Sequence, residues 1–459
     1  MKHIFYWALL IGMFSYSCVQ KEERPEQEEV SGDYYDWALT KAPESEWRHN
    51  YNKTLVTKMF LCSRDSLGAV GKVYLDFEQA LEVIKKLDGL TLQIPKIVYL
   101  VGWQYNGHDS KYPSWDEVNK ALKREQDSTA LASLQWLMRE AKQYNTTVSL
   151  HINMIDAFED SPLWDSYLAQ DVVAKDTLGN PIPGEMFWGM QSYQLSYARE
   201  WELGLAQKRI DRLMLLLPEL KEAGTIHIDA FHSKKPSNPD EVISPYLGYT
   251  LEQELAAQRK IYRYWRKYGM DVTNEAGMYW LRADPFLGLQ GMSWHYTERQ
   301  FVQDEWMGKP EDFVELPIDL AGFTPMQCEG AIMEDPRTLP GLLEQVPMEL
   351  VPWYYRRNGD VARYSNVLIT DNQLIAPVLW APRTLMAYSK KGGLEFEQFR
   401  LPSHWGLVME LEVYRLTTEG LQYLETIETT RYKNGKAAFN VFLDVMVKEG
   451  EVIVFKAKV

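Results

Sequence analysis

Two carboxylates each close a short apolar run of the chain. Asp229 lies in GTIHIDAF, and Glu275 lies in GMDVTNEAG. In the first run the isoleucines alternate, which predicts a strand that buries them on one side and places His227 and Asp229 together on the other. Enzymes built on parallel strands carry their reactive groups at the carboxyl ends of those strands. A pair of acids at two such ends indicates acid/base or nucleophilic chemistry.

Further polar groups follow two earlier runs that we expect to be strands. These groups are His108, Asp109, His151 and Asn153, in GWQYNGHDS (102–110) and HIN (151–153). Loops that follow parallel strands open at one face, so we expect these side chains to line one cleft with the acid pair. Such donors and acceptors suit sugar hydroxyls. Trp188, in EMFWGM, is expected either to cover a bound sugar or to pack as an ordinary core ring.

The elements needed to position these residues alternate between strand and helix. We expect strands in 96–103, 146–153, 224–231, 270–276 and 289–296, and helices in 77–90, 113–144, 199–222 and 249–268. Strands joined through helices run parallel, and this pattern predicts an α/β fold with a (β/α)8 TIM-type barrel. No GxGxxG motif follows the first of these strands, which counts against a dinucleotide-binding sheet. Short alternating runs near the C-terminus predict an all-β, sandwich-like domain.

The N-terminus has the pattern of an export signal. An apolar stretch over 4–14 is followed by SYSC, which predicts a lipoprotein signal with Cys18 as the lipidated residue and a bacterial, lipid-anchored location in the periplasm or at the cell surface. We therefore expect these parts: a signal over 1–18, an acidic disordered tether over 19–33, an N-terminal segment packed on the barrel over 34–95, the catalytic barrel over 96–371, and the β-sandwich over 372–459.

Composition narrows the class of partner. A net charge of −15 argues against nucleic acid and against direct binding to an anionic membrane surface, so the only membrane contact expected is the lipid anchor. The 16 tryptophans and 27 tyrosines favour a carbohydrate ligand. After Cys18 only Cys62 and Cys328 remain, so at most one disulfide is possible. We expect a monomer without a cofactor or metal signature, and leave open a structural calcium ion.

The motifs GWQYNGHDSKYP, LHIN, HIDAFH and TNEAG, in this order, resemble the endo-α-N-acetylgalactosaminidases of glycoside hydrolase family 101, and are similar to family 129 in the same places. The resemblance implies a retaining enzyme that removes α-linked N-acetylgalactosamine, or Gal-β1,3-GalNAc, from serine or threonine of mucin-type O-glycans. It implies Asp229 as the nucleophile, Glu275 as the acid/base and Asp109 as an acid that holds sugar hydroxyls. The other expected substrate contacts are His108, His151, Asn153, His227 and Trp188.

Two other functions fit the same residues. One is an exo-acting α-galactosidase or α-N-acetylgalactosaminidase on the same barrel, and the other is a non-catalytic glycan-binding surface lipoprotein. Tyr112 stands where family 101 often has histidine, so contacts with outer sugars can differ. If Glu275 is not the acid, Glu185 and Asp284 are the next candidates.

Overall fold

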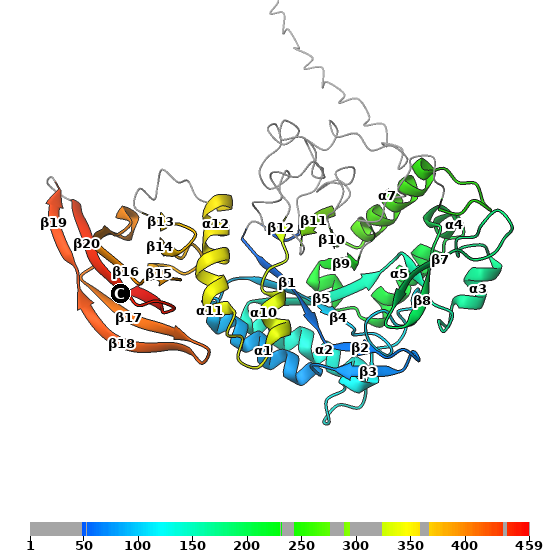
Figure 1. Ribbon diagram of the computed structural model, residues 1–459, viewed down its shortest axis with the longest axis horizontal. Helices are drawn as coiled ribbons and strands as arrows, with labels where there is room; N and C mark the ends of the chain where they lie inside the picture. The colour runs from blue at the N-terminus through cyan, green and yellow to red at the C-terminus, as the bar shows by residue number, and fades with distance from the viewer. Residues whose placement is uncertain are drawn as a thin grey trace, which may run out of the picture.

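The computed structural model has an α/β part built on a parallel sheet and a C-terminal part built from antiparallel sheets (Figure 1). The structure describes residues 48–51, 53–229, 231, 243–275, 289–293, 324–358, 367–434 and 438–458. The expected signal, its Cys18 and the tether lie outside these residues. In the described part of the chain, no helix has the length and apolar character needed to cross a bilayer.

Seven parallel strands form the central sheet, and their order in space is their order along the chain. They are β1 (Leu55–Phe60), β4 (Lys96–Val101), β5 (Thr146–Asn153), β9 (Thr225–Asp229), β10 (Asp271–Glu275), β11 (Leu289–Ser293) and β12 (Thr324–Pro325). A doubly wound sheet reverses its strand order at a switch point, and this sheet does not. Directly after β12, the Gln327 backbone N–H donates to Val56 O at 2.8 Å, so the two edges of the sheet are linked.

The first strand corrects one expectation. β1 pairs with β4 residue by residue, from Leu55 opposite Lys96 to Phe60 opposite Val101. The sheet therefore begins at Leu55, and the expected boundary at residue 96 is wrong. LVTKMF contains a lysine that breaks its apolar pattern, but Lys58 is 5% exposed and its Nζ lies 3.9 Å from Glu329 Oε1.

Capped helices cover the sheet (Figure 1). The helix α1 (Phe77–Leu90) is capped by Asp76. The Asp76 carboxylate accepts from the Gln79 backbone N–H, and the Gln79 side-chain oxygen accepts from the Asp76 backbone N–H. The helix α7 (Leu251–Lys267) begins with the same motif at Thr250. Both helices confirm the sequence prediction. Other elements of this part are β2 (Cys62–Arg64), β3 (Val70–Val73), α2 (Ala130–Glu140), η3 (Ala141–Tyr144), β6 (Asp156–Ala157), α3 (Trp164–Ala169), α10 (Glu329–Glu334), α11 (Leu342–Gln345), η6 (Val346–Leu350) and α12 (Val351–Asn358).

Two expected helices are different in the structure. The helix expected over 199–222 is divided into α4 (Tyr197–Glu202), α5 (Leu205–Leu216) and α6 (Leu220–Ala223), with Gly204 at φ +70° at the first break. The first half of 113–144 holds only the 3₁₀ turn η2 (Lys120–Leu122). Its backbone bonds elsewhere, because Glu117 O accepts from the Tyr105 N–H at 3.0 Å and the Asn119 N–H donates to Trp103 O at 2.8 Å.

The C-terminal part contains two packed antiparallel sheets. A six-stranded sheet has the order β13-β14-β15-β21-β17-β18, and a three-stranded sheet has the order β16-β20-β19. Their strands are β13 (Leu368–Ile369), β14 (Gln373–Pro377), β15 (Thr384–Ser389), β16 (Leu394–Arg400), β17 (Glu410–Thr417), β18 (Gly420–Glu428), β19 (Thr430–Asn434), β20 (Ala438–Val447) and β21 (Val452–Ala457), with the turn η8 (Ser403–Trp405) after β16. The predicted all-β region is thus present, and its first strand starts four residues before the expected boundary.

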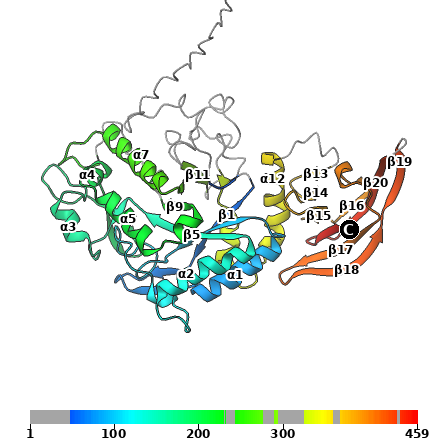
Figure 2. The same ribbon diagram turned by 180° about the vertical axis from the view of Figure 1, so that it is seen from behind.

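The inner strands of the six-stranded sheet have buried residues on both faces. Ile375 and Ile453 pack in one core with Leu443 of the smaller sheet, whereas Ala376 and Val454, on the opposite face, join the core of the α/β part. The indole N–H of Trp380 donates to Thr91 O at 2.8 Å, just beyond α1. α1 and β18 are in contact where the two parts meet (Figure 2).

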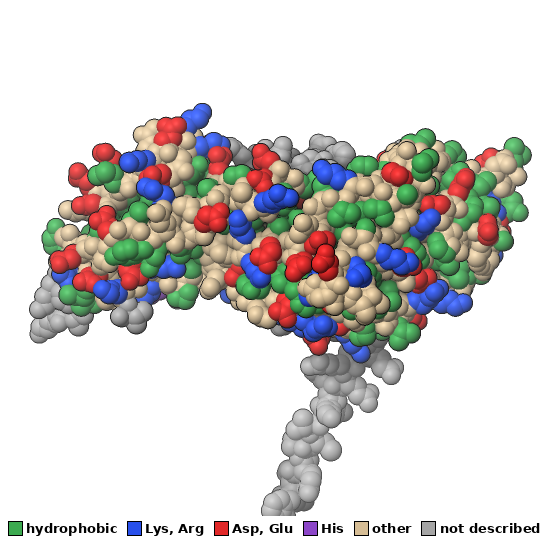
Figure 3. Space-filling view, turned by 90° about the horizontal axis from the view of Figure 1, so that it is seen from below, with side chains coloured by type: hydrophobic (Ala, Val, Ile, Leu, Met, Phe, Trp, Pro, Cys, Tyr) green, Lys and Arg blue, Asp and Glu red, His purple; other side chains and the backbone are tan. Residues whose placement is uncertain are grey.

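Charged side chains of both signs are interspersed over the face seen in Figure 3. In the described residues, Cys62 and Cys328 are both buried free thiols, so the one disulfide that the sequence allowed is not formed.

Candidate active site

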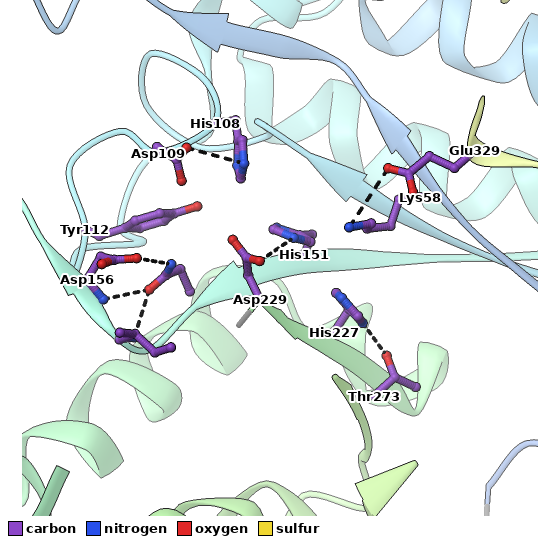
Figure 4. Close-up of polar contacts among 12 residues, drawn as sticks. Lys58, His108, Asp109, Tyr112, His151, Asp156, His227, Asp229, Thr273 and Glu329 are labelled. Atoms are coloured by element: carbon purple, nitrogen blue, oxygen red, sulfur yellow. Dashed lines mark hydrogen bonds and ion pairs between the residues drawn. The ribbon is translucent and has the colours of Figure 1, made fainter. Parts of the chain in front are cut away.

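Asp229 is the last residue of β9 and lies at the carboxyl edge of the parallel sheet, with 16% of its side chain exposed. Its Oδ1 lies 3.7 Å from Nε2 of His151, which comes from the neighbouring strand β5. Figure 4 shows the two side chains facing one another. The predicted display of Asp229 beyond the end of a buried strand is confirmed by this geometry.

The loop after β4 brings a second pair of polar groups to this edge. Gly102, at φ +78°, allows the loop to start against β2, because a Cβ there would lie 2.1 Å from Cys62 O. The His108 N–H donates to the same Cys62 carbonyl at 2.8 Å. Asp109 follows at φ +56°, and its Oδ2 lies 3.4 Å from His108 Nε2. The loop is thus fixed by backbone contacts and presents His108 and Asp109 towards β5 and β9.

These loops bring His108, His151 and Asp229 together. One ring nitrogen of each histidine and one carboxylate oxygen of Asp229 all lie within 4.8 Å of one another. The ring centroids of His108 and His151 are 5.3 Å apart, in an edge-to-face arrangement. The three residues come from loops and strands far apart in the chain, as the sequence predicted.

Trp188 reaches the same edge from a hairpin of β7 (Pro183–Phe187) and β8 (Met190–Gln194), which follows β5. Its indole N–H donates to Asp109 Oδ2 at 3.1 Å, and the residue remains 44% exposed. Its ring lies 6.4 Å from that of Phe60. The indole N–H is therefore held beside the Asp109 carboxylate, while part of the Trp188 side chain stays open to solvent.

His227 corrects an expectation. It is fully buried two residues before Asp229, with Nδ1 at 2.8 Å from Thr273 Oγ1 (Figure 4). Burial, reinforced by His151 and Lys58, holds the pKa of His227 well below its usual range, so its ring is neutral at physiological pH. The ring packs beneath His151, with centroids 5.3 Å apart. His227 supports the site from below and is not placed to contact a sugar.

Asn153 is also misassigned as a substrate contact. It is 1% exposed, and its Nδ2 donates to Asp156 Oδ2 at 2.8 Å. Its Oδ1 accepts from the backbone N–H groups of Ile155 and Asp156, both at 2.8 Å. The amide is used to hold the turn after β5, a common role for asparagine at such a position.

Two neighbours of the site were missed from the sequence. Lys58 and Phe60 come from β1, and Phe60 packs edge-on to His108 at 5.4 Å. The alternation of Val56, Lys58 and Phe60 was the signal that could have placed them. Tyr112 is fully buried; burial, with the charges of Asp109 and Asp229, raises its pKa well above 10, so it remains a neutral phenol.

Glu275 ends β10, the strand next to β9. Asn274 lies opposite Ile228 in this pairing, so Glu275 follows at the edge where Asp229 ends β9. The Glu275 side chain lies outside the described residues, as does Asp284. Glu185, the other alternative acid, is exposed on β7.

Arg209, on α5, connects the loop after β4, which carries His108, to β5, which carries His151. Its guanidinium forms a buried ion pair with Glu200, with Nε and Oε1 2.8 Å apart. Its Nη1 also donates, at 3.4 Å, to the carbonyls of Pro113, in the loop after β4, and of Asn153, the last residue of β5. Arg209 therefore ties the loop after β4 to the end of β5, and the ion pair with Glu200 holds its guanidinium in place.

The comparison with family models agrees with the motif-based resemblance. The family model described as Endo-alpha-N-acetylgalactosaminidase matches residues 63–279, which contain His108, Asp109, His151 and Asp229. The family-model match confirms the resemblance to this family over that segment. No curated protein matches the chain.

Solved structures with similarity to the chain include α-N-acetylgalactosaminidase NagBb from Bifidobacterium bifidum. Its Gal-NHAc-DNJ complex is 11% identical with a TM-score of 0.45, over 64% of this chain and 44% of that one. Its ligand-free form is 12% identical with a TM-score of 0.45, over 75% and 56%. TtGalA, an α-galactosidase from Thermus thermophilus in complex with p-nitrophenyl α-D-galactopyranoside, is 14% identical with a TM-score of 0.34, over 58% and 47%. The chain thus spans about half the length of these proteins.

Proposed function

We propose that this protein is a retaining glycoside hydrolase that cleaves α-linked N-acetylgalactosamine, or Gal-β1,3-GalNAc, from serine or threonine of mucin-type O-glycans. The observation that carries the proposal is Asp229, partly exposed at the end of β9 beside His151 and His108, within the segment that matches the family. We also infer that the parallel sheet closes into a TIM-type barrel, to which the described residues contribute seven strands, since its strand order is sequential and Gln327 links its last strand to its first.

In the proposed mechanism, an oxygen of ionised Asp229 attacks the anomeric carbon while Glu275 protonates the departing serine or threonine oxygen. The products of this step are a covalent glycosyl-enzyme and the free serine or threonine hydroxyl of the substrate glycoprotein. Glu275 then takes a proton from water, which attacks the same carbon and restores Asp229 with net retention. This chemistry requires the two carboxyl groups to stand about 5–5.5 Å apart. Ends of adjacent strands such as β9 and β10 can meet that requirement.

The surrounding groups suit a sugar in this position. The Asp109 carboxylate can accept hydrogen bonds from sugar hydroxyls, and the His108 ring can donate or accept them. His151 Nε2, 3.7 Å from Asp229 Oδ1, can orient the Asp229 carboxylate. The exposed part of Trp188 offers a ring face to the apolar side of a pyranose, while its N–H keeps the indole fixed to Asp109.

Three aryl glycosides test the proposal: p-nitrophenyl α-GalNAc, p-nitrophenyl Gal-β1,3-α-GalNAc and p-nitrophenyl α-galactoside. Release of the disaccharide indicates endo action, and preference for either monosaccharide indicates exo action. Proton NMR of the first product gives its anomeric configuration, and an inverted product would contradict the mechanism. Glycan binding without hydrolysis would identify a glycan-binding lipoprotein instead.

We propose in addition that the protein is exported and anchored through Cys18. Labelling of cells with a radioactive or alkyne-tagged fatty acid should mark the wild type and leave Cys18→Ser unlabelled. Labelling of both forms would exclude Cys18 as the anchor.

A further inference from the structure

We propose that His108, His151 and Asp229 also form a binding site for a divalent transition-metal ion of the zinc class, and that a bound ion blocks the enzyme. One ring nitrogen from each histidine and one Asp229 oxygen are within 4.8 Å of one another, at the edge where Asp229 is exposed. Two imidazoles and a carboxylate form a donor set that favours zinc, nickel, copper or iron over magnesium and calcium.

The distances fit such an ion with little movement. Zinc binds imidazole nitrogen and carboxylate oxygen at about 2.0–2.2 Å in a tetrahedron, which puts ligand atoms roughly 3.4 Å apart. His151 Nε2 and Asp229 Oδ1 are already 3.7 Å apart. No pair of ligand atoms would need to close by more than about 1.4 Å to reach that tetrahedral spacing. His108 has 18% of its side chain exposed, so rotation of this ring can supply the movement.

The packing holds the central ligand in place. His151 is 2% exposed, and its ring is held between those of His108 and His227, each with its centroid 5.3 Å away. Asp109, 3.4 Å from His108, adds a second carboxylate beside the cluster, which favours a cation. The buried ammonium of Lys58 would repel a bound cation, but its Nζ lies 3.9 Å from Oε1 of Glu329, whose negative charge opposes that repulsion. A fixed imidazole near two carboxylates is thus prepared for a cation without reorganisation of the core.

The expected effect on the reaction rests on the proposed function. An ion held by Asp229 occupies the oxygen lone pair that would attack the sugar, and it fills the space in front of the carboxylate. It should therefore compete with substrate, raising KM without changing kcat. Binding of the ion itself depends only on the three side chains and can be measured without any substrate.

The test uses the full protein and four variants. Calorimetric titration with zinc, and the visible absorption of added cobalt, report binding independently of activity. His108→Gln, His151→Gln and Asp229→Asn each remove one ligand, whereas His404→Gln removes an exposed histidine of the C-terminal part and serves as the matched control. Circular dichroism establishes that each variant is folded, and His108→Gln, on a loop, provides a second test if His151→Gln does not fold.

We expect one zinc ion per chain, with binding weakened by at least about 100-fold in each ligand variant, because loss of even an outer partner of a metal ligand costs about 10- to 100-fold. His404→Gln should bind as the wild type does. Zinc should inhibit hydrolysis competitively, and EDTA should restore it. Absence of stoichiometric binding, or binding that the ligand variants retain, would overturn the site. Binding at the site with unchanged KM would overturn the blocking role, and binding by a protein inactive on all three glycosides would support the site while refuting the proposed function.

Discussion

Replacement of Arg209 by methionine should destabilise the protein and disorder the site together. Arg209 and Glu200 are 5% and 0% exposed, and Nη2 donates to Glu200 Oε2 at 2.9 Å in addition to the contact through Nε. Methionine retains most of the packing volume but leaves the Glu200 carboxylate buried without its cation. Breaking one side of a buried pair costs about 3–5 kcal/mol, mainly because the remaining charge is uncompensated.

A second arginine of α5 provides a control for the size of this loss of stability. Arg212, also on α5, pairs with Asp116 at 2.8 Å but is 54% exposed, so Arg212→Met should cost less than about 1 kcal/mol. In the double variant Glu200→Gln, Arg209→Met, the buried charge is gone and the amide can still accept from Tyr167, whose hydroxyl is 3.0 Å from Glu200 Oε1. The double variant should therefore be more stable than Arg209→Met alone.

Loss of Arg209 also removes its hydrogen bonds to the carbonyls of Pro113, in the loop that carries His108, and of Asn153, in the strand that carries His151. A shift of about 1 Å in a site can reduce the rate by about 100-fold, and we expect a reduction of this order in kcat/KM. Urea unfolding followed by tryptophan fluorescence, together with hydrolysis of an aryl α-glycoside, measures both effects. Equal stability of Arg209→Met and Arg212→Met, or a double variant that is the least stable of the three, would refute the argument from the buried charge.

Four other changes have expected outcomes. Asp229→Asn should retain the fold and reduce turnover by at least about 1000-fold, since it removes the covalent step; a loss below about tenfold would exclude it as the nucleophile. Glu275→Ala should impair a serine-linked glycan far more than an activated aryl glycoside, with azide restoring part of the rate; equal loss on both substrates and no rescue would direct attention to Glu185 or Asp284. Trp188→Ala should raise KM by about tenfold, equivalent to about 1.4 kcal/mol. Trp188→Phe should raise KM by less, because an aromatic ring remains even though the hydrogen bond to Asp109 is lost. An unchanged KM in Trp188→Ala would show that the ring does not contact the sugar. Burial raises the pKa of Glu254 to about 7 from 4.5, so its contribution to stability, about 3 kcal/mol, is complete below pH 4.5 and is lost as pH rises through 7. Urea unfolding between pH 5 and 8 should show this decline in the wild type and a flatter profile in Glu254→Gln.

Local patterns were enough to locate the main elements and the central acid. The alternation in GTIHIDAF identified both β9 and the exposed end at which Asp229 lies. Apolar positions at helical spacing identified α1 and α7, and the structure shows that each helix begins with a capping motif, at Asp76 and at Thr250. These features depend on neighbours within a few positions of the chain, so they can be recognised in the sequence alone.

Other features depend on contacts between distant segments. β1 belongs to the sheet because it pairs with a strand about forty residues later, and because Lys58, which obscured its pattern, has Glu329 as a partner in the core. Asn153 faces the same edge as His151, but the turn after β5 uses both ends of its amide. The sequence could not distinguish these two polar residues.

The sequence by itself determined the type and order of the polar groups and the strand ends on which they lie, because side-chain alternation along a strand is a local property. The tertiary structure decided which of them meet. It placed His151 beside Asp229, buried His227 beneath both and brought Trp188 to Asp109 across 79 positions of the chain. These contacts are set by strand pairing, loop hydrogen bonds and core packing, which no single segment contains.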